Sequence, residues 1–199
     1  MALTPSSMLP LGTTAPDFAL PSTGGQVVKL SNRTGSRGTV VLFICNHCPY
    51  VIHIADSLAQ VAAEYMEKGI GFVAINSNDT SAYPDDNMEN MIREKQRRGY
   101  PFPYLLDETQ DVAKAYDAAC TPDIYLFDGD LRLVYRGQFD DSRPTRISSG
   151  NYDSSDNTPS GADLKAAMDA LLAGESVPGD QKPSVGCNIK WKPGNEPAG

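Results

Sequence analysis

The stretch TVVLFICNHCP, residues 39–49, decides how this chain is expected to fold. Its first six residues are apolar or β-branched and predict a buried strand, and Pro49 suits the first turn of a helix. Cys45 and Cys48 therefore lie between a strand and a helix N-terminus. Unpaired N–H groups and partial positive charge at that end stabilise a thiolate over a thiol. The stretch thus predicts a pair of redox-active thiols.

Strand and helix signals alternate along the rest of the chain. An amphipathic repeat predicts a helix over residues 49–68, and residues 70–75 are typical of a second buried strand. A charged helix is expected at residues 87–98. Two apolar segments, residues 124–127 and 131–136, flank Asp-Gly-Asp and predict a hairpin. This alternation predicts an α/β fold with a central mixed β-sheet flanked by helices.

The two ends of the chain differ from its middle. Residues 16–30 contain a Gly-Gly turn between apolar runs and predict an N-terminal β-hairpin extension of the fold. We expect an N-terminal extension at residues 1–9, one domain at residues 10–174 and a Pro/Gly-rich tail at residues 175–199. The tail holds the only tryptophan, in VGCNIKW (residues 185–191), so part of it is expected to dock on the domain.

The composition of the chain limits the cellular compartment and the kinds of partner that we expect. The net charge of −8 and the pI near 4.7 oppose binding to nucleic acid or to an anionic membrane. No stretch approaches the ~20 apolar residues of a membrane span, and the first residues lack the pattern of a signal peptide. We therefore expect a soluble, cytoplasmic protein. In a reducing compartment its four cysteines are expected to serve catalysis or metal binding rather than structural disulfides.

A CxxC motif is also half of a structural zinc site. Such a site needs a second CxxC or a pair of histidines, whereas the other two cysteines, Cys120 and Cys187, are isolated. The position of the motif between a strand and a helix favours redox chemistry. We expect no metal and no cofactor.

The order of elements resembles the thioredoxin superfamily: a strand, CxxC, a long helix, a strand, a helix, then Thr121-Pro122 before a strand and a glycine hairpin. Three motifs resemble the peroxiredoxin-related redoxin branch more closely: APDF (15–18), LD (106–107) and CTPD (120–123). The run CNHCPYV (45–51), together with GCNIKWK (186–192), is similar to a peroxiredoxin-like group of that branch. The resemblance covers roughly residues 10–192 and implies a thioredoxin-like fold.

The resemblance also implies roles for single residues. Cys45 matches the nucleophilic cysteine and Cys48 the resolving one. Pro122, after Thr121, matches a proline whose preceding bond is cis and which leaves backbone groups free to pair with substrate. His47 is similar to the histidine of disulfide isomerases, which stabilises the thiolate and makes the couple more oxidising than thioredoxin. The apolar strand before Cys45 contains no acidic residue, so the buried proton acceptor of thioredoxins is expected to be missing.

The function expected from these features is thiol-disulfide oxidoreductase. Its partners would be protein or small-molecule disulfides and a thiol reductant such as thioredoxin or glutathione. One alternative is a thiol peroxidase that reduces peroxides, with Cys48 as the attacking thiol and Arg136 as a guanidinium donor. Another is a copper- or zinc-binding chaperone that uses Cys45, Cys48 and either His53 or Cys187. His53 is otherwise expected on a helix surface.

Cys187 allows two interpretations. A buried cysteine in a docked tail can be inert and pack as a small hydrophobic side chain. Alternatively, the tail lies near the CxxC motif and Cys187 exchanges with the pair as a third redox thiol. Disulfide geometry limits the second interpretation, because the two Cα atoms must lie within about 7 Å of each other.

Overall fold

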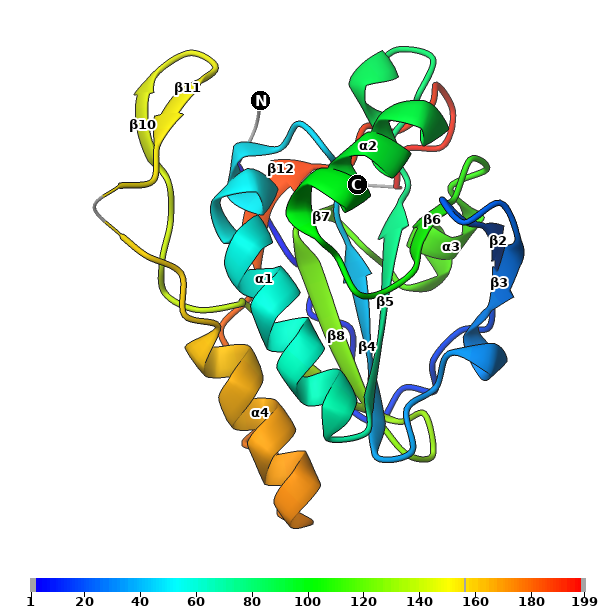
Figure 1. The fold of residues 1–199 in the computed structure, drawn as a ribbon, viewed down its shortest axis with the longest axis vertical. Helices are drawn as coiled ribbons and strands as arrows, with labels where there is room; N and C mark the ends of the chain where they lie inside the picture. The colour runs from blue at the N-terminus through cyan, green and yellow to red at the C-terminus, as the bar shows by residue number, and fades with distance from the viewer. Residues whose placement is uncertain (1–2, 156, 198–199) are drawn as a thin grey trace.

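A computed structural model describes residues 3–155 and 157–197 and has a mixed α/β fold around a five-stranded sheet (Figure 1). Strands β4, β5 and β6 are parallel, whereas β8 and β9 are antiparallel to their neighbours. The spatial order is β6 (Tyr104–Leu106), β5 (Ile70–Asn76), β4 (Gly38–Phe43), β8 (Asp123–Asp128), β9 (Leu133–Arg136). The expected mixed central sheet is confirmed.

Strand β4 lies at the centre of the sheet because both of its faces are apolar. All six of its residues are buried. Val40 and Leu42 belong to one hydrophobic core, and Val41 and Phe43 belong to a second core on the opposite face. A strand that is covered on both faces is typically a continuous run of apolar residues. Residues 39–44 form such a run.

Helices cover both faces of the sheet. In Figure 1, α1 (Pro49–Glu67) and α4 (Ala162–Ala173) lie on the left side of the sheet, and the apolar sides of both contribute to the first core. Helix α2 (Met88–Arg98) follows the N-cap residue Asn87, whose side chain accepts a hydrogen bond from the Asn90 backbone N–H. Helices α1 and α2 agree with the helices expected from the sequence at residues 49–68 and 87–98.

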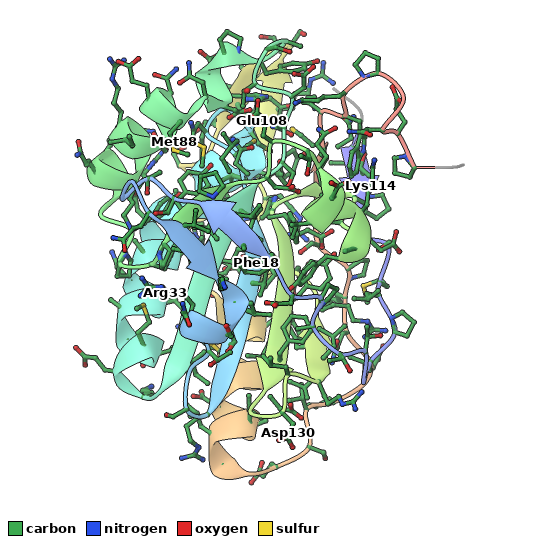
Figure 2. All side chains as sticks on the ribbon, turned by 90° about the vertical axis from the view of Figure 1, so that its right-hand side faces the viewer. Phe18, Arg33, Met88, Glu108, Lys114 and Asp130 are labelled. Atoms are coloured by element: carbon green, nitrogen blue, oxygen red, sulfur yellow. The ribbon has the colours of Figure 1, made fainter. Side chains whose placement is uncertain are left out.

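The second core lies under the N-terminal hairpin. Strands β2 (Ala19–Pro21) and β3 (Val27–Lys29) form this hairpin, followed by the 3-10 turn η1 (Leu30–Asn32). Figure 2 shows the hairpin in the foreground, with Phe18 beside it. The Phe18 ring packs 6.4 Å from that of Tyr116, just after α3 (Asp111–Ala115). The expected hairpin extension is therefore present and covers one face of the sheet.

A second sheet joins the two ends of the chain. It has the order β1 (Leu3–Pro5), β12 (Val185–Asn188), β7 (Cys120–Thr121), with all pairs antiparallel. Strand β12 lies beside the N-terminal end of α1 in Figure 1. Ile189, which follows it, is buried in the second core. The tail thus reaches the end of the molecule that carries the CxxC motif.

The polar segment after β9 contains a small hairpin of its own. Strands β10 (Thr145–Ser148) and β11 (Asn151–Asp153) pair and project from the body of the molecule at the upper left of Figure 1.

No helix within the described residues combines the length and the apolar character needed to cross a lipid bilayer.

Candidate active site

The CxxC motif occupies the junction that the sequence predicts. Strand β4 ends at Phe43, and α1 begins at Pro49 with Cys48 as its N-cap residue. Cys45 is 2% exposed and Cys48 is fully buried. Neither is part of a disulfide, so the pair is in the dithiol form. A substrate can therefore reach the sulfurs only if the site opens.

Thr121 touches both sulfurs of the motif. Its hydroxyl lies 3.5 Å from the Cys45 Sγ, and its backbone carbonyl accepts a hydrogen bond from the Cys48 Sγ at 3.0 Å. The Thr121–Pro122 peptide bond is cis, as the resemblance implied. Pro122 also lines a small pocket with Tyr50, on the first turn of α1. The expected auxiliary residues Thr121 and Pro122 therefore lie at the thiol pair.

The two thiols have opposite tendencies to ionise. Burial, a hydrogen bond with Cys48 and the carboxylate of Asp86 raise the pKa of Cys45. Burial also opposes ionisation of Cys48, but hydrogen bonds from Cys187, Cys45 and Thr121 outweigh it and lower the pKa of Cys48. The expected order of attack, Cys45 before Cys48, stays a prediction, and this local arrangement favours the opposite order.

A buried acid stands beside the pair. Oδ2 of Asp86 lies 2.7 Å from Nδ1 of His47, and the Asp86 side chain is fully buried. A hydrogen bond with Asp86, which outweighs partial burial, raises the pKa of His47. The imidazole also stacks on the Tyr83 ring, with 5.7 Å between the centroids. Asp86 thus fixes the position of His47 at the motif and favours its protonated form.

Asp86 corrects the expectation that no buried acid serves the thiols. It comes from the turn η2 (Pro84–Asp86), not from the strand before Cys45. Its Oδ1 accepts the Asn46 backbone N–H, and its Oδ2 accepts the Asn78 side-chain amide, both at 2.8 Å. The sequence contained one signal for it, since the loop that follows β5 must start at the sheet edge where β4 ends.

The donor set at the motif can be compared with that of a metal site. Ligand atoms of Cys45, His47 and Asp86 all lie within 4.8 Å of one another. Thiolate, imidazole and carboxylate suit zinc. The Asp86 oxygens, however, already accept two hydrogen bonds and contact His47. A metal ion would have to displace these contacts. The arrangement therefore fits a role of Asp86 in positioning His47 better than a metal site.

His53 corrects a second expectation, because it is buried and not on a helix surface. Its Nε2 lies 2.9 Å from the Ser142 hydroxyl, which in turn donates to Asp140 Oδ1 at 2.5 Å. Burial lowers the pKa of His53. Arg136 likewise has a partner elsewhere, since its Nη1 donates to Gln181 at 2.9 Å. Neither residue shares the contacts of the thiol pair that a metal or peroxide site would need.

The remaining cysteines differ in their position. Cys187 shares a side-chain hydrogen bond with Cys48, so the tail brings a third sulfur to the pair. The Cys120 Sγ instead donates to the Pro122 carbonyl at 3.4 Å. Burial raises the pKa of Cys120, which makes it a poor nucleophile.

Comparison with known proteins identifies similar chains. The family model described as Redoxin matches residues 10–153. An uncharacterized conserved protein from Geobacillus kaustophilus is 54% identical, with a TM-score of 0.90 over 97% of this chain and 98% of that one. A hypothetical protein from Sinorhizobium meliloti 1021 is 48% identical, with a TM-score of 0.87 over 96% of this chain and 100% of that one.

More distant matches carry functional names. The thiol-disulfide oxidoreductase ResA of Halalkalibacterium halodurans is 25% identical over 133 residues, which are 66% of this chain and 71% of that protein. The peroxidoxin BcpB of Mycobacterium tuberculosis is 20% identical, with a TM-score of 0.57 over 82% of this chain and 96% of that one. The second likeness concerns the fold alone.

Proposed function

The chain belongs to the Redoxin family, and from this premise we propose that it is a thiol-disulfide oxidoreductase whose Cys45–Cys48 pair cycles between dithiol and disulfide. The observation that carries the proposal is that Thr121 contacts both sulfurs at the N-terminus of α1, with its hydroxyl 3.5 Å from the Cys45 Sγ and its carbonyl 3.0 Å from the Cys48 Sγ, which keeps the two thiols close together. Sulfurs in such proximity need only a small movement to form an S–S bond. The similarity to the ResA oxidoreductases supports the same activity.

Cys48 is the proposed attacking thiol, because its position at the N-terminus of α1 and its lowered pKa both favour loss of its proton. The Cys48 thiol loses its proton and its sulfur attacks a substrate disulfide, one substrate sulfur leaves as a thiolate that takes up that proton, and a mixed disulfide remains on Cys48. The Cys45 thiol then loses its proton and attacks the Cys48 Sγ, which releases the second substrate sulfur. The substrate gains two electrons and two protons, and the protein is left with a Cys45–Cys48 disulfide.

His47 has an electrostatic role in this cycle. Asp86 raises its pKa, so the imidazole keeps its positive charge to a higher pH than an ordinary histidine. Its electrostatic coupling to Cys48 favours the thiolate of the reduced protein. A stabilised reduced form makes the oxidised pair a stronger oxidant.

The proposed partners follow from the exchange chemistry. Substrates would be protein or small-molecule disulfides, and a thiol such as thioredoxin or glutathione would reduce the Cys45–Cys48 disulfide again. We propose the cytoplasm as the location, because a reducing compartment keeps such a pair cycling. Pro122 and Tyr50 line a small pocket, and because Pro122 follows Thr121, which contacts both sulfurs, this pocket is the proposed approach of the substrate chain.

Reduction of insulin disulfides by dithiothreitol tests the proposal. The wild-type chain and Cys120→Ser are expected to accelerate the reaction equally, because Cys120 does not contact the pair through a hydrogen bond. Cys48→Ser, which lacks the attacking thiol, and Cys45→Ser/Cys187→Ser, which lacks both neighbouring cysteines, are expected to fall to the uncatalysed rate. Full activity in either variant contradicts the proposal. A parallel assay of hydrogen peroxide consumption, with the same four proteins, distinguishes disulfide exchange from peroxidase activity.

A further inference from the structure

Cys187 is held next to the thiol pair by the pairing of two strands that lie far apart in the sequence. In the second sheet, Cys187 of β12 is the register partner of Thr121 of β7. Thr121 is the residue whose carbonyl accepts the hydrogen bond of the Cys48 Sγ. Cys187 and Cys48 also belong to the same hydrophobic core, and each affects the pKa of the other. Cys48 therefore has two other cysteines, Cys45 and Cys187, close to it.

The backbone around Cys187 is specialised for this approach. A Cβ added at Gly186 would lie 2.0 Å from the Thr121 carbonyl oxygen, so only glycine allows β12 to come this close to β7. After Cys187, the Ile189 backbone N–H donates to the Ala119 carbonyl at 3.1 Å. Cys187 itself is 3% exposed. Its position is fixed by the fold rather than by chance contact of a loose tail.

We propose that Cys187 is a second resolving thiol for Cys48, so that the oxidised protein can hold a Cys48–Cys187 disulfide as well as the Cys45–Cys48 disulfide. The inference rests on the proposed function and extends its pair of thiols to three. Cys48 is common to both disulfides. Cys120, which lies one residue before Thr121 but donates to the Pro122 carbonyl, is not part of the exchange.

The exchange step conserves atoms and electrons. Starting from Cys45–Cys48, the Cys187 thiol loses its proton and its sulfur attacks the Cys48 Sγ. The Cys45–Cys48 bond breaks, the Cys48–Cys187 bond forms, and Cys45 leaves as a thiolate that takes up the proton. No external oxidant or reductant is needed. The result is an oxidised protein with Cys45 available as a thiol.

In the reduced protein Cys187 is a protonated thiol and has no disulfide to attack. Its hydrogen bond with Cys48, together with burial, raises the pKa of Cys187 and keeps that sulfur protonated. Once Cys48 is in a disulfide, its negative charge is gone, and with it the first of these two causes. The barrier to ionising Cys187 is therefore lower in the oxidised protein than in the dithiol form.

Cys45→Ser isolates the second disulfide. The full-length variant is treated with glutathione disulfide, quenched in acid, alkylated and mapped by mass spectrometry. We expect a peptide pair linked through Cys48 and Cys187, with Cys120 alkylated. Cys45→Ser/Cys120→Ser should give the same linkage, whereas Cys45→Ser/Cys187→Ser should retain glutathione on Cys48. A stable glutathione adduct on Cys48 of Cys45→Ser, with Cys187 fully alkylated, overturns the inference.

Two glycine substitutions, Gly186→Ala and its control Gly179→Ala, test the close approach of β12 to β7 without removing any sulfur. They apply even if Cys45→Ser does not fold. Oxidised wild-type protein and Gly179→Ala should both yield a Cys48–Cys187 linkage, because a Cβ at Gly179 meets no atom within 4 Å. Gly186→Ala should lose that linkage and keep Cys45–Cys48. If wild-type protein forms only Cys45–Cys48 and reduces insulin, the inference fails and the proposed function stands. If it forms neither disulfide, the proposed function fails as well.

Discussion

Nδ1 of His47 lies 2.7 Å from Oδ2 of Asp86, and this contact joins the middle of the CxxC motif to a turn almost forty residues further along the chain. The carboxylate is fully buried and the imidazole is partly exposed. Asp86, which lies outside the CxxC motif, therefore favours the protonated form of His47 within the motif. The protonation state of His47, and through it the stability of the Cys48 thiolate, depends on Asp86.

Asp86→Asn is expected to bring the pKa of His47 down toward its ordinary value of 6.5, because the amide removes the negative partner. Titration of the His47 ring protons by NMR measures it. Asp85→Asn is the matched control, since the exposed Asp85 contacts Asn46 through its backbone carbonyl. An unchanged His47 titration in Asp86→Asn would show that the carboxylate does not set the charge.

The same contact predicts a pH dependence of stability. The folded-state pKa of His47 is raised above that of the unfolded chain, so the contact stabilises the fold fully below pH about 6.5. That contribution is lost as the pH rises through the raised pKa. Urea unfolding across this range should show a decline in the free energy of unfolding that is steeper in wild type than in Asp86→Asn.

Alkylation will decide which thiol is the stronger nucleophile. We expect iodoacetamide at neutral pH to label Cys48 ahead of Cys45, because Cys48 is the N-cap residue and has the lowered pKa. Peptide mass spectrometry after a short exposure measures the ratio. Faster labelling of Cys45 would restore the order implied by the thioredoxin resemblance, with Cys45 attacking and Cys48 resolving.

His47→Gln is expected to lower the reduction potential of the pair, because loss of the positive charge destabilises the Cys48 thiolate. The wild-type potential should lie above that of thioredoxin, about −270 mV. Equilibration with glutathione buffers measures both. His53→Gln is the control, since that histidine contacts Ser142 instead of the thiol pair and should leave the potential unchanged. Equal potentials for wild type and His47→Gln would remove the proposed role of His47.

The sequence predicts the framework of the site because that framework is local. An apolar run followed by Cys45, Cys48 and Pro49 specifies a strand, a turn and a helix start within eleven residues. The hairpin around residues 129–130 was also predictable from turn chemistry. These elements follow from propensity and periodicity, which act over a few residues.

The sequence could not supply the contacts made by Asp86 and Cys187. Both come from segments whose position depends on how the sheets assemble, not on local pattern. The turn that carries Asp86 follows β5, and it reaches Asn46 because β5 and β4 are parallel neighbours. The sequence does not say which strand β12 pairs with. The need for glycine at position 186 becomes evident only once β12 lies beside the Thr121 carbonyl. Long-range pairing of this kind is invisible in a single sequence.

Asp123, the first residue of β8, gives a test of the core beneath the site. Burial raises the pKa of this carboxyl to about 6, although Oδ2 accepts hydrogen bonds from the Ala119 backbone N–H and the Tyr125 hydroxyl, both at 3.1 Å. The unfolded chain gives up this proton at lower pH than the folded chain. The free energy of unfolding must therefore fall as the pH rises from about 4 to about 6.

Asp123→Asn should stabilise the protein at pH 7, by up to ~3 kcal/mol, because the amide keeps an acceptor oxygen without a buried charge. Urea unfolding at pH 7 and near pH 4 measures the gain, which should vanish at the lower pH, where the wild-type carboxyl is also neutral. Asp117→Asn is the control, because its side chain is exposed and should change stability little at either pH. A loss of stability at pH 7 in Asp123→Asn would mean that the ionised carboxylate is needed by its two donors, and that burial does not dominate at this position.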